Sequence, residues 1–206
     1  MTRLILVRHG ETEWNRVERF RGRADVSLNP TGLAQAEATA RRIRAGWQVS
    51  AVYCSPLSRA AATARAIAAL FQLAATPIQD LIDIDYGEWQ GKSPEEVRSL
   101  WPDLLSAWYE KPHTVRIPGG ESLENIRTRS VRAVRQIAAR HREGSVVLVA
   151  HTVINRVILL EILNLGNDRF WRIRQDTCAI NEMELDGGAM TLVSMNDTCH
   201  LADVRL

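Results

Sequence analysis

The sequence has few cysteines, no long apolar run and almost no excess charge. Its three cysteines, Cys54, Cys178 and Cys199, are far apart and lack the spacing of metal ligands, so we expect no disulfide framework and a cytoplasmic location. Lys and Arg number 26 against 24 Asp and Glu, a formal net charge of +2. This balance gives no reason to expect a nucleic acid or a membrane as partner. The apolar residues 4–7 are too few for a signal-peptide core, and no stretch reaches the roughly 18 apolar residues of a membrane span.

Internal repeats and low-complexity linkers are also absent. The chain has 206 residues, of which 46% are apolar and 24% charged, an ordinary composition for a globular protein with a sizeable core. We therefore expect one domain over residues 1–206.

Short apolar runs alternate with helical patterns along the chain. Residues 4–7, 49–54 and 146–150 read as strands buried on both faces. Apolar residues at helical spacing follow each strand, in stripes that begin at Leu33, Leu57, Leu123 and Val153. For the second stripe, Ser55 is the expected N-cap and Pro56 the first helical residue. This alternation predicts an α/β fold, a three-layer α/β/α sandwich with a mostly parallel central sheet.

Two segments depart from the alternation. Residues 92–122 contain four of the seven prolines together with Trp101, Trp108 and Tyr109. We expect a small helical lid in which these aromatic side chains pack, with stacking on the substrate as the alternative. Residues 179–185 and 190–195 flank the turn signal Asp186-Gly187-Gly188, which predicts a β-hairpin.

Charged and imidazole side chains follow the predicted strands. In open α/β sheets, ligands bind beyond the carboxyl ends of the strands. Arg8 and His9, Arg59 and His151 would meet there, and the backbone N–H groups of Gly10, Ser55 and Thr152 would face a bound anion. A phosphoryl group matches such a cluster in charge and geometry.

Several ordered motifs resemble those of the histidine phosphatase superfamily, in its phosphoglycerate-mutase-like branch. The first is Arg8-His9-Gly10-Glu11-Thr12. Further blocks begin at Asn29-Pro30, Ser55-Pro56, Asp83, Pro118-Gly119-Gly120 and Val149-Ala150-His151, so the resemblance covers residues 3 to about 165.

The resemblance implies a role for each matching residue. His9 resembles the nucleophile that accepts the phosphoryl group. Arg8, Arg59 and His151 resemble the phosphate pocket, and Asn15 a hydrogen-bond donor to the phosphate. Neutral imidazole is a competent nucleophile near pH 7, and cationic partners stabilise the charge of the transition state. No metal and no cofactor is then required.

The proton donor departs from the family pattern. The family usually places a Glu where this chain has Asp83, which is one methylene shorter. We assign Asp83 the acid/base role, with Asp85 and Glu88 as alternatives. After His151, Thr152 stands where the family more often has a small glycine; it narrows the pocket or adds a hydroxyl donor.

Two further groups of polar residues each allow two interpretations. Arg16, Arg19, Arg21 and Arg23 form a basic run that is either a solvated loop or a site for a second anionic group, with Arg21 as the expected contact. Glu121 and Ser122 either border the pocket or cap the helix that follows. His113, His141 and His200 read as surface residues without partners.

These observations predict a metal-independent phosphomonoester hydrolase that acts on a small phosphorylated metabolite through a phosphohistidine. One alternative is a cofactor-dependent phosphoglycerate mutase, although the 68 positions from Asp83 to His151 lack the paired basic residues of the mutase lid. Another is a catalytically silent module that binds phosphorylated ligands. The sequence ranks neither the substrates nor the oligomeric states, and the Phe170–Ile173 strip fits an interface as well as a core.

Overall fold

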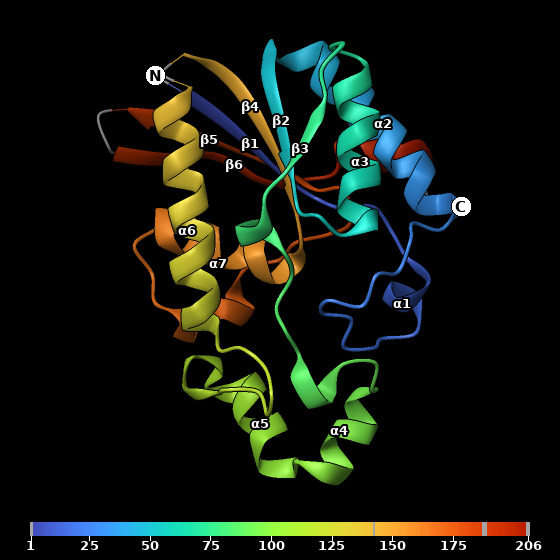
Figure 1. Ribbon diagram of the computed structural model, residues 1–206, viewed down its shortest axis with the longest axis vertical. Coiled ribbons are helices and arrows are strands. Elements are labelled where there is room, and N and C mark those ends of the chain that lie inside the picture. Colours follow the sequence, from blue (N-terminus) through green and yellow to red (C-terminus); the bar gives the residue numbers. More distant parts are fainter. Residues whose placement is uncertain (1, 142, 187–188, 205–206) are drawn as a thin grey trace.

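A six-stranded, mostly parallel sheet forms the centre of the molecule (Figure 1). The computed structural model describes residues 2–141, 143–186 and 189–204. The strand order is β3-β2-β4-β1-β5-β6, with β1 parallel to β4 and antiparallel to β5. The strands are β1 (Thr2–Arg8), β2 (Val49–Cys54), β3 (Ala75–Pro77), β4 (Gly144–Ala150), β5 (Ile180–Asp186) and β6 (Ala189–Asp197).

Helices cover both faces of this sheet, which confirms the predicted α/β sandwich. In Figure 1, α2 (Pro30–Gly46) and α3 (Ser58–Ala69) lie on one side, and α6 (Leu123–Arg140) and α7 (Thr152–Ile162) on the other. Successive side chains of a strand point to opposite faces. Leu4 and Leu6 of β1 therefore join the core under α6 and α7, while Ile5 and Val7 join the core under α2 and α3.

The predicted hairpin is formed by β5 and β6, which pair antiparallel. β5 lies one residue later than expected, and β6 extends the expected strand by one residue at its start and two at its end. The predicted turn at Gly187-Gly188 lies outside the described residues.

The proline-rich segment folds into short helices beyond one end of the sheet (Figure 1). They are α4 (Pro94–Leu100), α5 (Pro102–Glu110) and the 3₁₀ turn η3 (Pro112–Thr114), each with proline at the first helical position, where its missing N–H costs nothing. Trp108 of α5 is buried and packs edge-on against Trp89 and Trp171. Tyr109, in contrast, is 45% exposed.

The remaining short elements connect these strands and helices. They are α1 (Glu13–Arg16) and four 3₁₀ segments: η1 (Gln79–Leu81), η2 (Gly87–Trp89), η4 (Asn167–Arg172) and η5 (Cys199–Val204). No helix in the described part of the chain is long and apolar enough to cross a membrane.

The start of α3 differs from the prediction. The helix begins at Ser58 rather than at Pro56, and Leu57 is extended. The Ser55 hydroxyl bonds the ring of His151, at 2.7 Å, while Asp25 accepts the Ser58 N–H at 2.7 Å. Ser55 Oγ still accepts the local Leu57 N–H at 3.3 Å, and the carboxylate of a distant segment binds the first N–H of the helix.

Three expectations about individual side chains were also wrong. Leu33, placed on the buried stripe of α2, is 52% exposed. His141 and His200 are half-buried and have partners: His141 Nε2 lies 2.9 Å from the Tyr53 hydroxyl, and His200 Nε2 lies 3.0 Å from Thr39 Oγ1. Both contacts join residues far apart in sequence, which periodicity alone does not reveal.

Candidate active site

Three parallel strands deliver polar groups to one edge of the sheet. Arg8 pairs with Ala150 in register, and the His9 N–H donates to the Ala150 carbonyl at 3.0 Å. The Ser55 N–H donates to the Val149 carbonyl at 2.9 Å. The residues that follow β1, β2 and β4 are therefore held side by side by backbone hydrogen bonds.

The ring of His9 is oriented by its own neighbour. Its Nδ1 lies 2.6 Å from the Gly10 carbonyl oxygen. Because a carbonyl only accepts, Nδ1 carries the proton, and Nε2 is left with a lone pair. The side chain is buried, and this burial, together with the charges of Arg59 and Arg8, lowers the pKa of His9 well below 6.5. The imidazole is therefore neutral at pH 7.

The segment after His9 packs tightly on the start of α2. Asn29 caps this helix, since its Oδ1 accepts the Gly32 N–H at 2.8 Å, and its Nδ2 donates to Glu11 at 2.8 Å. A Cβ at Gly32 would overlap the Glu11 carbonyl. The Gly10 N–H donates to Thr63 Oγ1 at 3.1 Å, so it is engaged inside the protein and not directed at an anion as the sequence suggested.

His151 lies between Ser55 and Asp83. Its Nε2 is 2.7 Å from Ser55 Oγ, and its Nδ1 is 3.6 Å from Asp83 Oδ2. The rings of His9 and His151 have centroids 5.1 Å apart. Burial and the nearby arginines, Arg59 first, lower the pKa of His151 well below 6.5. Two neutral imidazoles thus share this site.

Two buried arginines flank the histidines. Arg59, fully buried, donates to the carbonyls of Ala24 and Gly22 at 2.7 Å each and pairs with Asp83 Oδ2 at 3.2 Å. Arg8 donates from Nη1 to the Gln175 carbonyl at 2.6 Å. Burial lowers the pKa of Arg8 to about 9, which still leaves the guanidinium charged at pH 7.

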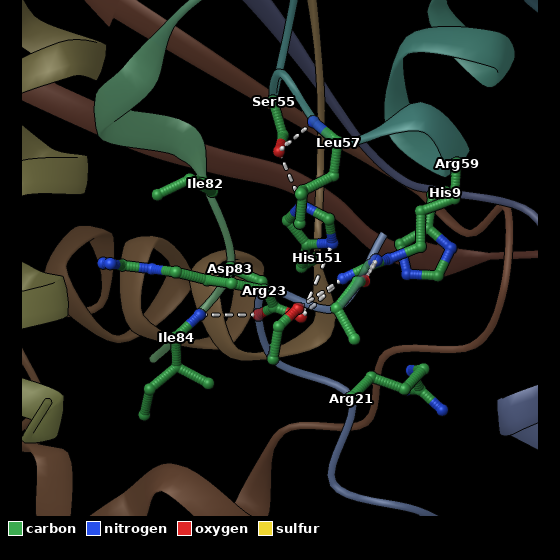
Figure 2. Close-up of polar contacts among 12 residues, drawn as sticks. His9, Arg21, Arg23, Ser55, Leu57, Arg59, Ile82, Asp83, Ile84 and His151 are labelled. Carbon is green, nitrogen blue, oxygen red and sulfur yellow. Dashed lines mark hydrogen bonds and ion pairs between the residues drawn. The ribbon is translucent and has the colours of Figure 1, made fainter. Parts of the chain in front are cut away.

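Asp83 is the carboxyl group at the centre of these contacts. Figure 2 shows contacts from Arg59 and His151 that meet on its Oδ2, while Oδ1 accepts the Ile84 N–H at 2.9 Å. Burial raises the pKa of Asp83, although the charges of Arg59 and Arg21 act in the opposite direction. A raised pKa gives the group a greater share of its protonated form.

The loop that carries Asp83 is clamped by α6. Arg129 donates to the carbonyls of Asp80, Ile82 and Asp83 at 2.7, 2.6 and 3.1 Å. It also pairs with Glu121 at 3.1 Å, so Glu121 supports the loop, while Ser122 caps α6. The alternative that Glu121 and Ser122 border the cavity has no support in these contacts.

The two alternative proton donors lie elsewhere. Asp85 pairs with Arg23 at 3.1 Å, and its Oδ1 accepts the Gly87 N–H at 2.9 Å. Glu88 is exposed. Of the three carboxylates, Asp83 contacts Arg59 and His151.

A cavity of about 390 Å³ opens at the side of this cluster that carries Arg8 and Asp83. Asn15, Arg21 and Thr152, three residues predicted to bind substrate, line it together with Arg8 and Asp83. Asn15 Oδ1 accepts from both the N–H and the hydroxyl of Thr12, which turns the amide oxygen away from an incoming anion. Arg21 donates to the Trp14 carbonyl at 3.0 Å.

Sequence reasoning missed other residues that line the cavity. Arg156, Tyr86 and Gln175 border it, and so does Tyr109, which the sequence assigned to lid packing. Arg156 lies one helical turn after Thr152, and this spacing of four residues is the signal that could have identified it. In the described ranges, no group of three or more His, Cys, Asp and Glu side chains could hold a metal ion.

Known proteins resemble this chain along almost its whole length. The family described as "Histidine phosphatase superfamily (branch 1)" matches residues 4–198. Phosphoserine phosphatase 1 of Hydrogenobacter thermophilus is 34% identical, over 98% of this chain and 96% of the relative. A metal-independent phosphoserine phosphatase of Arabidopsis thaliana is also 34% identical, over 99% of this chain and 85% of the relative.

A solved structure agrees with these relatives. A mutant phosphoserine phosphatase from Entamoeba histolytica, in complex with phosphoserine, superposes with a TM-score of 0.81 at 27% identity. The match covers 98% of this chain and all of that one. The resemblance read from the motifs is therefore confirmed.

Proposed function

Because this chain belongs to the histidine phosphatase superfamily (branch 1) and is a phosphatase of small phosphomonoesters, we propose that it works by double displacement through His9. The observation that carries this proposal is the hydrogen bond from His9 Nδ1 to the Gly10 carbonyl. It leaves a lone pair on Nε2 of a neutral ring, beside two buried arginines. A nucleophile next to fixed positive charge is what phosphoryl transfer requires.

In the first step, Nε2 of His9 attacks phosphorus, and a P–N bond forms as the P–O bond to the alcohol breaks. Arg8 and Arg59 stabilise the charge on the phosphoryl oxygens. The Ser55 hydroxyl donates to His151 Nε2, which leaves the proton on Nδ1, where it is available to the same oxygens. Asp83 gives its proton to the departing alkoxide.

In the second step, water attacks the phosphohistidine. Asp83, now ionised, takes a proton from this water, and the P–N bond breaks to release inorganic phosphate. The enzyme returns to its starting protonation state, because one proton leaves Asp83 in the first step and one returns in the second. Protein cations supply the charge stabilisation, so this cycle uses no metal ion.

We further propose that the substrate is phosphoserine or a similarly small phosphorylated acid. Two observations support this substrate class: the relatives described as phosphoserine phosphatases, and the volume of the cavity, about 390 Å³. In this scheme the chain forms a single domain and acts in the cytoplasm, and α4 and α5 are a lid over the site. Cys54 and Cys178, both buried and free, are compatible with a reducing compartment.

Trapping the intermediate tests the mechanism. The wild-type enzyme is incubated with EDTA and a phosphoserine carrying labelled phosphate, and the reaction is quenched before phosphate analysis. We expect turnover and a protein-bound label that is acid-labile and stable in base. His9→Ala should lose both, whereas His113→Ala, which alters an exposed histidine outside the site, should keep both.

Two results would contradict the proposal. Turnover abolished by EDTA and restored by a divalent metal would show metal-dependent chemistry. A labelled protein that transfers phosphate between glycerate phosphates faster than it releases inorganic phosphate would show a mutase.

A further inference from the structure

Arg156 is a charged side chain of the cavity that the proposed chemistry does not use. It lies on α7 one turn after Thr152, and both residues line the cavity beside Arg8 and Asp83. Residues four apart share one face of a helix. Helix α7, whose N-cap is His151, therefore turns Thr152 of its first turn and Arg156 of its second turn toward the same cavity.

Two aromatic rings hold the Arg156 guanidinium in place. Its carbon Cζ lies 5.0 Å from the ring centre of Phe170 and 4.9 Å from that of Trp171. Phe170 is fully buried, and Trp171 is fixed by a hydrogen bond of 2.7 Å from its indole N–H to the Trp108 carbonyl. Stacking uses the flat faces of a guanidinium and leaves its N–H edges free.

Those N–H edges have no partner within the described chain. Arg156 forms no ion pair and no hydrogen bond with a described residue, and its buried Nε is unsatisfied. The Nε atoms of Arg8 and Arg21 are also unsatisfied, but the Nη1 groups of these two arginines donate to backbone carbonyls, and Arg19 pairs with Glu96. A partly buried cation without an anion is costly, and a bound anion would remove that cost.

We propose that Arg156 binds a carboxylate of the substrate and so selects phosphorylated acids over phosphorylated alcohols. A guanidinium edge and a carboxylate match as a bidentate pair. A single guanidinium carries one positive charge, which balances one carboxylate and falls short of a second phosphoryl dianion. This inference rests on the proposed function and adds to it the residue that reads the rest of the substrate.

Pairs of substrates that differ by the carboxylate test this assignment. Phospho-L-serine is compared with phosphoethanolamine, and 3-phosphoglycerate with glycerol 3-phosphate, through kcat/KM for each. In the wild type we expect the acid of at least one pair to be preferred. Arg156→Gln should lower this preference by about 10- to 100-fold, the usual effect of one charged hydrogen-bonded contact.

Two further variants separate recognition from folding. Arg156→Lys keeps the charge and loses the bidentate edge, so it should lose part of the preference, and it remains informative if the glutamine variant does not fold. Arg172→Gln removes an exposed arginine next to Trp171 and should leave the preference unchanged. p-Nitrophenyl phosphate, which has no carboxylate, reports on the phosphatase chemistry in every variant.

Each adverse result has a definite meaning. A wild type that hydrolyses p-nitrophenyl phosphate but shows no preference for the acid of either pair overturns the role of Arg156 and leaves the phosphatase intact. Equal losses for acid and alcohol in Arg156→Gln also overturn it. A preference for 2,3-bisphosphoglycerate over 3-phosphoglycerate that Arg156→Gln removes would assign the site to a second phosphoryl group instead.

Discussion

Asp83→Asn keeps the size of the side chain and removes the proton that the proposed first step gives to the alkoxide. A carboxylate has two acceptor oxygens and an amide has one, so the amide can keep either the bond from the Ile84 N–H, at 2.9 Å in the wild type, or that from Arg59, at 3.2 Å. Serine alkoxide is a poor leaving group that needs a proton, whereas nitrophenolate leaves as a stable anion. We therefore expect the substitution to affect the two kinds of ester very differently.

The expected sizes follow from the contacts. General acid catalysis contributes about 10²- to 10⁴-fold, or roughly 3 to 5 kcal/mol of transition-state stabilisation. We expect this loss for phosphoserine and less than about 10-fold for p-nitrophenyl phosphate. Arg59 keeps its two carbonyl partners at 2.7 Å, so the free energy of unfolding should fall by only about 1 to 3 kcal/mol.

The assay measures kcat and kcat/KM for both esters between pH 5 and 9. Burial raises the pKa of Asp83, and a general acid must be protonated to act. In the wild type, kcat for phosphoserine should therefore fall as the pH rises through that pKa, and this decline should be absent in Asp83→Asn. Asp85→Asn and Glu88→Gln are the matched controls, because they alter the two alternative carboxylates and should keep the decline.

Equal losses on phosphoserine and p-nitrophenyl phosphate in Asp83→Asn would refute the assignment of the proton donor. So would a selective loss of phosphoserine turnover in Asp85→Asn or Glu88→Gln.

Three other substitutions or conditions give separate tests. Burial lowers the pKa values of His9 and His151 below 6.5, so below pH 6.5 the unfolded chain binds protons that the folded one excludes. The free energy of unfolding from urea titrations should fall by about 1.4 kcal/mol per histidine and pH unit. The fall should be steeper in Asp83→Asn, because the raised pKa of that carboxyl favours folding as the pH drops. Gly32→Ala places a Cβ on the backbone that follows His9; we expect a loss of about 1 to 3 kcal/mol in the same titration and a lower kcat. Arg129→Met removes three bonds to the Asp83 loop and should cost about 2 to 3 kcal/mol, with kcat for phosphoserine falling more than kcat for p-nitrophenyl phosphate.

The main architecture could be predicted because it depends on local patterns. Strands buried on both faces read as continuous apolar runs, and β1 and β4 are such runs. Their parallel pairing then brings His9 and His151 to the same edge of the sheet. The helices followed from their periodicity, but the start of α3 at Ser58 did not: the N–H of this residue donates to Asp25, which lies 33 positions away in the sequence.

The candidate site also combines features that motifs predict and features that only long-range packing determines. Motifs predicted that Arg8, His9, Arg59 and His151 lie together, and Asp83, the proton donor that they also predicted, contacts Arg59 and His151. Local sequence gave no sign that the Gly10 N–H is taken by Thr63. Long-range packing also decided that, among the arginines lining the cavity, Arg156 has N–H groups without a partner in the described part of the chain.

Composition and local order along the chain determined the fold class and the ends of the central strands, and they predicted the reacting groups, since these features depend on neighbours within a few residues. Tertiary structure alone decided the protonation of His9, the burial that shifts the pKa of Asp83, and the aromatic rings under Arg156. The reason is physical: desolvation, ring stacking and hydrogen-bond direction depend on distances between segments that the chain brings together only when it folds.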